Sequence, residues 1–132
     1  MNVFTLELRS ALAADTLEDV TDFVGEDAGG SFGLRARHER FMTSLVFGMA
    51  RLRRASGAWE YLALPGALLY FVDNTLWIAT ARYERDSDYE RVNTALTSTL
   101  VAEAEQLQTS RESLSQLEEA LLRRLRELGR QR

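Results

Sequence analysis

The sequence predicts an α+β protein in which an N-terminal antiparallel β-sandwich is followed by a C-terminal antiparallel two-helix hairpin. All the phenylalanines, both tryptophans, the single proline and every glycine except Gly129 precede Thr80, and no aromatic residue follows Tyr89. The pattern changes at the same place, from alternating apolar residues broken by turns to leucines at helical spacing. We therefore expect the β-sandwich over residues 1–84 and the helical hairpin over residues 86–132.

The first strands are expected where apolar and polar residues alternate. Residues 2–9 alternate well, and residues 17–24 do so less cleanly, with Leu17 and Phe23 expected on one face and Val20 on the other. A turn at residues 27–30 ends this second strand. The next alternating segment is long, and we expect a single strand over residues 42–53, in which Val46, Gly48, Ala50 and Leu52 share a face. Gly48 indicates a bulge or a close backbone approach.

The remaining strands are short and are separated by strong turn signals. They are expected at residues 59–64, 67–72 and 76–79. A turn at residues 55–58 precedes the first of them, and Pro65-Gly66 bends the chain before the second. Asp73-Asn74 predicts a two-residue hairpin turn, because both residue types tolerate positive φ. Short strands at such intervals are typical of a sandwich or a small barrel.

Helical spacing begins near Asp88, with Asp86 or Ser87 as the expected N-cap. The apolar stripe of this first helix consists of Val92, Leu96, Leu100, Ala104 and Leu107. A capping-box pattern at residues 109–112 predicts the start of a second helix. Its narrow seam consists of Leu114, Leu117, Leu121, Leu125 and Leu128, and Gly129 is placed to end it. A single long helix is the alternative, because no glycine or proline separates the two segments.

Composition limits the classes of function. The chain has 132 residues, a net charge of -4 and a pI near 5.1, which argues against nucleic acid as a main partner. It has no cysteine, which excludes disulfides and thiolate chemistry, and all sixteen basic residues are arginines, which excludes a P-loop lysine. No apolar run reaches the length of about 20 residues that spans a bilayer, and the N-terminus lacks the features of a signal peptide. We expect a cytosolic protein.

Residues that support catalysis are scarce, and we expect no catalytic residue and no metal site. His38 is the only histidine, no cysteine can assist it in binding a metal, and no nucleophile-elbow motif is present. An enzyme built around His38 is thus the least favoured reading. Two groups of arginines could each bind an acidic partner or have a structural role. The structural role is protection of a strand edge for the first group and compensation of the helix dipole for the second. These groups are Arg51, Arg53 and Arg54, and Arg123, Arg124 and Arg126 near the C-terminus.

Two motifs carry a resemblance to a known family. In the first, Gly30, Phe32, Gly33 and Leu34 are followed by His38 and Thr43; the second comprises Leu64, Gly66, Leu68, Leu69 and the turn and strand to Thr80. In this order, the motifs resemble the epsilon subunit of F-type ATP synthases, and the sequence of residues 26–33 is most similar to the alternate, N-type branch of that family. The chain departs from the family pattern at Ala36-Arg37 and Arg40, where a glycine and prolines are usual.

The resemblance implies a rotor subunit with no catalysis of its own. The sandwich would sit beside the gamma subunit and on the membrane c ring, at the cytoplasmic face of the bacterial plasma membrane. Ser31 and His38 would face the c ring or its contact with gamma, together with Gly30, Phe32 and Gly33. The helices would fold on the sandwich or extend toward the catalytic alpha and beta subunits and restrain ATP hydrolysis. Arg123, Arg124 and Arg126 would meet the acidic surface of those subunits.

Some members of this family bind ATP through a motif at the start of the first helix. This chain keeps Asp88 and Arg91 of that motif but lacks both flanking residues. No cofactor is therefore expected, and ATP as a regulatory ligand at these two residues is an open question. The alternative function, from a different class, is a free-standing β-sandwich adaptor that oligomerises through its C-terminal helices.

Overall fold

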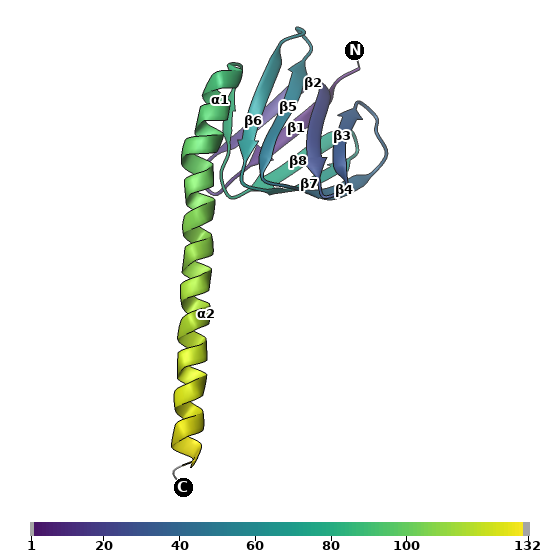
Figure 1. Ribbon diagram of the computed structural model, residues 1–132. Helices are drawn as coiled ribbons and strands as arrows, with labels where there is room; N and C mark the ends of the chain where they lie inside the picture. Colours follow the sequence, from purple (N-terminus) through teal and green to yellow (C-terminus); the bar gives the residue numbers. More distant parts are fainter. Residues whose placement is uncertain (1, 131–132) are drawn as a thin grey trace. The chain divides into compact units, whose positions relative to one another are not determined.

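The computed structural model describes residues 2–130, without the side chains of 99–101, 103, 104, 107, 109–111 and 128–130 (Figure 1). Contacts divide the chain into two compact units, Met1–Leu100 and Val101–Arg132. The strands of the first unit, within the described residues, are β1 (Phe4–Arg9), β2 (Ala14–Asp27), β3 (Gly30–Arg35), β4 (Phe41–Leu45), β5 (Gly48–Arg54), β6 (Trp59–Leu64), β7 (Ala67–Val72), β8 (Thr75–Thr80) and β9 (Glu84–Asp86). They are followed by α1 (Tyr89–Ala95) and a π-helical turn, η1 (Leu96–Leu100).

The strands form two layers that share the long strand β2. The first part of β2 pairs with β1, and the sheet continues through β8 and β7 to β4. The second part of β2 pairs with β3 on one side and with β5 on the other, and that sheet continues through β6 to β9. The β1–β8 pair is parallel and the other pairs are antiparallel. The predicted fold class, a β-sandwich followed by C-terminal helices, is confirmed.

The core lies between the two layers and is built from the inward positions of both sheets. Its fully buried side chains are Phe4, Phe23, Phe71, Leu6, Leu8, Leu34, Leu52, Leu62, Leu64, Leu69, Leu76 and Ile78. Burial of a leucine- or phenylalanine-sized side chain stabilises a fold by about 1.5–3 kcal/mol, so this cluster holds the layers together. No buried side-chain polar atom in the described residues lacks a hydrogen-bond partner.

Strand β2 departs from the strict alternation that we predicted. Leu17, Val20 and Phe23 are all buried although they are three residues apart. Register shifts in the ladder with β1 and between Val20 and Asp22 in the ladder with β5 account for this spacing. An extra residue at a bulge turns the following side chains to the other face. The prediction that Val20 faces away from Leu17 and Phe23 is therefore wrong.

The single strand predicted over residues 42–53 is also wrong. The segment is divided into β4 and β5, which pair with β7 and β6 respectively and so belong to different layers. Val46 and Phe47 connect them and are exposed, whereas Ala50 and Leu52 are buried as expected. A β-carbon on Gly48 would meet no atom within 4 Å, so this glycine marks the crossover and not a close backbone approach.

The predicted turns are confirmed. Asp73 and Asn74 adopt φ angles of 49° and 59°, which are the left-handed values of a tight two-residue hairpin. Pro65-Gly66 separates β6 from β7, and Gly66 has a φ of 131°. The turn at residues 55–58 is closed by a hydrogen bond from the N–H of Arg54 to the carbonyl of Ala58 at 2.8 Å.

Helix α1 begins one or two residues later than predicted. Asp88, and neither Asp86 nor Ser87, is its N-cap, and the Asp88 carboxylate accepts a hydrogen bond from the N–H of Glu90. Val92 is buried against Ala63 of β6, with partly buried Met49, Tyr61 and Leu96 around them. This small cluster attaches α1 to the outer side of the second layer.

The second unit contains α2, a single helix from Val101 to Arg130. The predicted helix start at residues 109–112 is wrong, and a hairpin with its turn there is not formed. The reason is local, because no glycine or proline interrupts the helix-forming residues on either side. Leu114, Leu117, Leu121 and Leu125 are 56–63% exposed, while the Leu128 side chain lies outside the description. No helix in the described residues has an apolar stretch long enough to cross a membrane.

Candidate interaction surfaces

The outer side of the first layer carries an exposed apolar surface. Met42, Tyr70 and Trp77 are direct cross-strand neighbours on β4, β7 and β8, and Leu68 lies next to them on β7. Met42 is 67% exposed, Leu68 61% and Trp77 44%. We call these four residues the apolar face. Large contiguous apolar groups on a protein surface mark places where another macromolecule binds.

Polar groups border the apolar face on the side of β1. The Arg9 guanidinium lies 6.0 Å from the centre of the Trp77 ring and forms an ion pair with Glu7. The Thr16 hydroxyl donates to the same Glu7 carboxylate at 2.8 Å. A surface with an apolar centre and a hydrogen-bonded polar border has the composition of a protein–protein interface.

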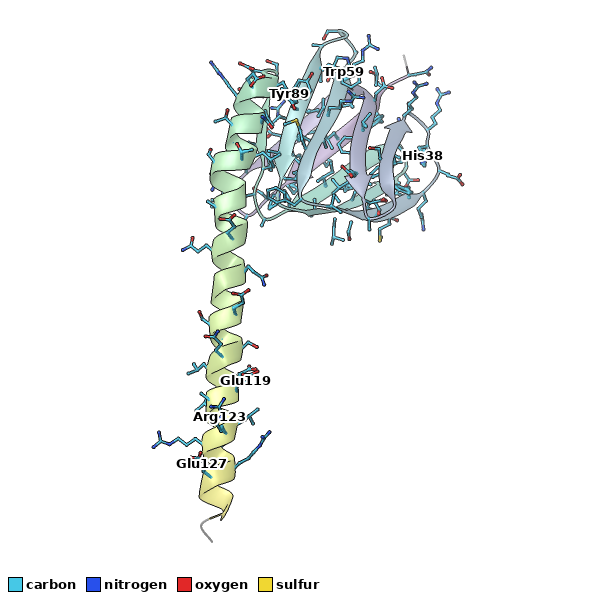
Figure 2. The ribbon with its side chains drawn as sticks, in the orientation of Figure 1. His38, Trp59, Tyr89, Glu119, Arg123 and Glu127 are labelled. Carbon is cyan, nitrogen blue, oxygen red and sulfur yellow. The ribbon has the colours of Figure 1, made fainter. Side chains whose placement is uncertain are left out.

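His38 lies at the edge of the sandwich beside β3, as Figure 2 shows. Its ring meets the rings of Phe41 and Phe71 edge-on, at 5.8 and 5.9 Å between centroids. Its Nδ1 atom is 2.7 Å from the carbonyl oxygen of Glu39. The imidazole is exposed and lies against two core aromatics, so its contacts are those of a residue that covers the core edge.

Residues Gly30 to Gly33 form the start of β3, after the turn that follows β2. Gly30 has a φ of 120°, and Phe32 packs against Phe23 and Phe41, while Ser31 and Gly33 are exposed. Ser31 is the second residue of β3, which is about 20 Å long, whereas His38 lies in the loop beyond the last residue of that strand, Arg35. The structure therefore does not bring these two predicted site residues together.

Asp88 and Arg91 form a local arrangement at the start of α1. Besides capping the helix, the Asp88 carboxylate lies 3.7 Å from the Arg91 guanidinium, which is also 3.7 Å from Asp86. A cavity of about 170 Å³ lies close by, between Tyr61, Tyr89 and the outer side of β2 and β5, but neither Asp88 nor Arg91 lines it. Asp88 and Arg91 thus both stabilise the start of α1.

Arg123, Arg124 and Arg126 are exposed on α2. Glu119, Arg123 and Glu127 follow one another at intervals of four residues along the helix (Figure 2). Opposite charges at this spacing lie on the same side of a helix and stabilise it by a few tenths of a kcal/mol. Arg123 thus lies between two carboxylates on its side of the helix.

A match to a protein-family model identifies the family of the β-sandwich. The model of the ATP synthase delta/epsilon chain, β-sandwich domain, matches residues 3–86, which is more than half of the chain. The chain belongs to the ATP synthase delta/epsilon family. The epsilon resemblance that we drew from Gly30 to Thr43 is confirmed. Within the structure, Thr43 of that motif donates to the Asp27 carboxylate at 2.8 Å, which ties β4 to the end of β2.

A named relative and two solved structures agree with this family. The chain is 36% identical over 66 residues to ATP synthase epsilon chain 2 of Cereibacter sphaeroides, a match that covers 49% of this chain and 45% of the relative. Two solved mitochondrial ATP synthases contain similar chains. The central stalk and c-ring structure from Tetrahymena thermophila gives a TM-score of 0.54 at 15% identity, over 61% of this chain and 64% of that one. The structure from Euglena gracilis gives a TM-score of 0.58 at 18% identity, and the match covers 71% of this chain and 61% of that one. At these identities, the structural matches establish the fold alone.

The sequence reasoning missed the apolar face of this delta/epsilon member. A signal was present: Leu68 stands beside Leu69, and Trp77 lies between Leu76 and Ile78, so apolar residues occupy both faces of β7 and β8. A strand with only one buried face normally has polar residues at the outward positions. Outward apolar residues on these two strands could therefore have indicated a binding surface.

Proposed function

We propose that this chain is a non-catalytic epsilon subunit in the central stalk of an F-type ATP synthase. It couples rotation of the catalytic head to the membrane c ring as part of the rotor. The observation that carries this proposal is the family's β-sandwich bearing an exposed apolar face on its outer side. The subunit would be a peripheral component at the cytoplasmic face of the bacterial plasma membrane.

The apolar face is the proposed docking surface for the gamma subunit. Burial of its exposed aromatic and aliphatic side chains would provide the free energy of association, since each Å² of apolar surface removed from water contributes about 25 cal/mol. Trp77 is the residue of the apolar face that we expect at the centre of the contact, because tryptophan is enriched among the residues that contribute most to binding. The polar border of Arg9 and Glu7 would fix the orientation of the partner.

The tip of the β2–β3 hairpin is the proposed contact with the c ring. Ser31 is exposed there, and the turn around Gly30 is held by the Asp27 carboxylate, which accepts from the N–H of Gly29 at 2.8 Å. His38, in the loop after β3, would belong to a separate region of the rotor contact. The separation of the two along the strand favours two distinct contacts over one combined site.

Helix α2 is the proposed regulatory arm. Its exposed leucines offer an apolar seam and its arginines offer positive charge, which together suit the apolar and acidic surface of the catalytic alpha and beta subunits. Binding of α2 there would hold the rotor and restrain ATP hydrolysis. A difference of a few kcal/mol between two positions of the arm would be sufficient to control the fraction of restrained motors.

Co-expression with the gamma subunit and the c ring tests the docking surface. The double variant Leu68→Glu/Trp77→Glu should no longer co-purify with gamma, because it places two charges in the contact. The variant Leu12→Glu is the matched control, since Leu12 is 95% exposed on the β1–β2 turn and lies outside the apolar face. Co-purification of the double variant at the wild-type level would refute the gamma-docking role of this surface.

Removal of residues 101–132 tests the regulatory arm. The shortened subunit should still assemble, because the sandwich and α1 form a compact unit without α2. The assembled enzyme should hydrolyse ATP faster than the one with the complete chain. Equal hydrolysis rates would reject the inhibitory role of α2 and leave the structural role of the sandwich in place.

A second candidate function rests on the same exposed leucines. A free-standing β-sandwich adaptor would use the α2 seam to form oligomers of this chain, in the manner of a coiled coil. Sedimentation of the purified protein distinguishes the two functions. A concentration-dependent oligomer that Leu117→Lys/Leu121→Lys dissociates, without any association with gamma, would favour the adaptor.

A further inference from the structure

We propose that the outer side of the second layer carries a binding groove for an acidic protein segment. The groove has a volume of about 790 Å³, and Arg35, Arg37 and Arg53 line it together with Asp22 and Trp59. It lies on the strands β3, β2, β5 and β6, on the opposite layer from the apolar face. The proposal does not depend on the stalk assignment, because it rests on residues that the proposed gamma contact does not use.

Strand pairing brings these residues into one row. Asp22 is the direct cross-strand partner of Arg35 on β3 and of Arg53 on β5, and Arg53 is in turn the partner of Trp59 on β6. Direct neighbours on one face of a sheet have side chains that point in the same direction. Four residues that are distant in the sequence thus share one surface.

The charges in the groove are unbalanced. Three arginines line it against one carboxylate, Asp22, which is bound by Arg35 at 3.0 Å. Arg37 and Arg53 have no carboxylate within ion-pair distance in the described part of the chain. The groove is therefore a local positive site on a chain whose net charge is -4.

The aromatic wall of the groove holds part of this charge in place. The Arg51 and Arg53 guanidinium carbons lie 5.1 and 5.8 Å from the centre of the Trp59 ring. Attraction between a cation and an aromatic face orients the guanidinium groups. Arg54 behaves differently, because it is paired with Asp19 and Glu60 at 2.5 and 2.7 Å, and these bonds raise its pKa. Of the run Arg51, Arg53 and Arg54, the two outward arginines are available to a partner.

Arg37 occupies a backbone conformation that favours glycine. Its φ is 65°, and its N–H donates to the Asn74 side chain at 2.7 Å. A residue other than glycine in this region is destabilised by its own β-carbon. The hydrogen bond to Asn74 therefore fixes the backbone that places the Arg37 side chain on the wall of the groove.

The spacing of the charges selects an extended acidic segment as the occupant. Arg35 and Arg53 lie on strands separated by β2, so their backbones are about 10 Å apart. Two carboxylates along an extended chain span such a distance, whereas one phosphate does not. The Arg35 side chain is also 86% exposed, and an exposed guanidinium binds a single small anion weakly. Several carboxylates on one segment would bind these arginines together.

Titration with a short oligoglutamate peptide tests this proposal. In a Trp77→Phe background Trp59 is the sole tryptophan, so its fluorescence reports directly on the groove. We expect a saturable fluorescence change that weakens as salt is added, and none with oligoglutamine. The variant Arg37→Gly/Arg53→Gln should raise the Kd for oligoglutamate about ten-fold while circular dichroism shows an intact fold.

Arg40→Gln is the matched control, because Arg40 is exposed on the same loop as Arg37 but does not line the groove. It should change the Kd less than two-fold or so, as expected for a distant surface charge. Absence of binding, or an equal loss in the Arg40 variant, would overturn the proposal. Tighter binding of inorganic tripolyphosphate or of an oligonucleotide than of oligoglutamate would also overturn it, since the occupant would then be a different class of ligand.

Discussion

The side chain of Asn74 accepts a hydrogen bond from the backbone N–H of Arg37 through Oδ1 at 2.7 Å. Its Nδ2 atom donates to the carbonyl oxygen of Val3 at 2.9 Å. One turn residue thus connects the β7–β8 hairpin, the loop after β3 and the segment before β1. This connection holds Arg37 in its left-handed conformation, and with it one wall of the groove that Arg35, Arg37 and Arg53 line.

Loss of the Asn74 side chain should destabilise the sandwich. Asn74→Gly keeps the positive φ accessible but removes both hydrogen bonds, so we expect a loss of about 1–2 kcal/mol in the free energy of unfolding. Asn74→Ala should lose about 1 kcal/mol more, because alanine is strained at this φ of 59°. Urea denaturation of the two variants measures the difference. Equal stability of wild type and Asn74→Gly would show that the two bonds contribute nothing.

Two glycines on neighbouring strands should respond oppositely to alanine. A β-carbon at Gly25 would lie 2.9 Å from Phe23 Cε1 and 3.1 Å from Leu45 Cδ2, so Gly25→Ala should cost about 1–3 kcal/mol. At Gly33 the nearest atom is 3.8 Å away, and Gly33→Ala should be neutral or stabilising. Thermal melts of both variants provide the comparison. A smaller loss for Gly25→Ala than for Gly33→Ala would contradict the packing seen around Gly25.

Stability should decrease at alkaline pH because of Tyr83. Burial, and a hydrogen bond of 2.7 Å from its hydroxyl to Asp15, raise the pKa of Tyr83 to about 12. The unfolded chain releases this proton near pH 10, so the stabilising contribution is complete below about pH 10 and is lost as the pH rises toward 12.

Tyr83→Phe is the variant that tests this pH dependence. Its absorbance titration near 295 nm should lack the step near pH 12, and its stability should fall less steeply than that of the wild type between pH 10 and 12. Tyr89→Phe serves as a control for the removal of a phenol from an exposed position. If the two variants gave the same alkaline denaturation curve, the Tyr83–Asp15 bond would not be the cause.

Attachment of α1 to the sandwich should depend on Val92. Val92 is 1% exposed and packs on Ala63, and burial of a valine side chain stabilises by about 2 kcal/mol. Val92→Asp should therefore speed hydrogen exchange of the α1 amides, while the urea transition of the sandwich core stays nearly unchanged. Thr94→Asp, on an exposed position of the same helix, should leave exchange slow. Fast exchange in the Thr94 variant as well would point to loss of helix propensity instead.

Local sequence was sufficient to predict much of the fold. The turn at Asp73-Asn74, the bend at Pro65-Gly66 and the alternating strand after Asn2 depend on neighbouring residues alone, and all three are confirmed. The same holds for the motif from Gly30 to Thr43 that indicated the family. Bulges and strand crossovers were not predictable in this way, because pairing with distant strands decides them. Thus Val20 faces inward, and residues 42–53 are divided between two layers.

The sequence by itself determined a β unit followed by helices, because alternation, turn residues and leucine spacing act over a few neighbours. Only the tertiary structure decided which side chains share a surface. It placed Met42 beside Tyr70 and Trp77, and it brought Arg35 next to Asp22 and Arg53, since cross-strand pairing joins segments that are far apart in the chain. Both proposed binding surfaces follow from those pairings, which the order of residues does not reveal.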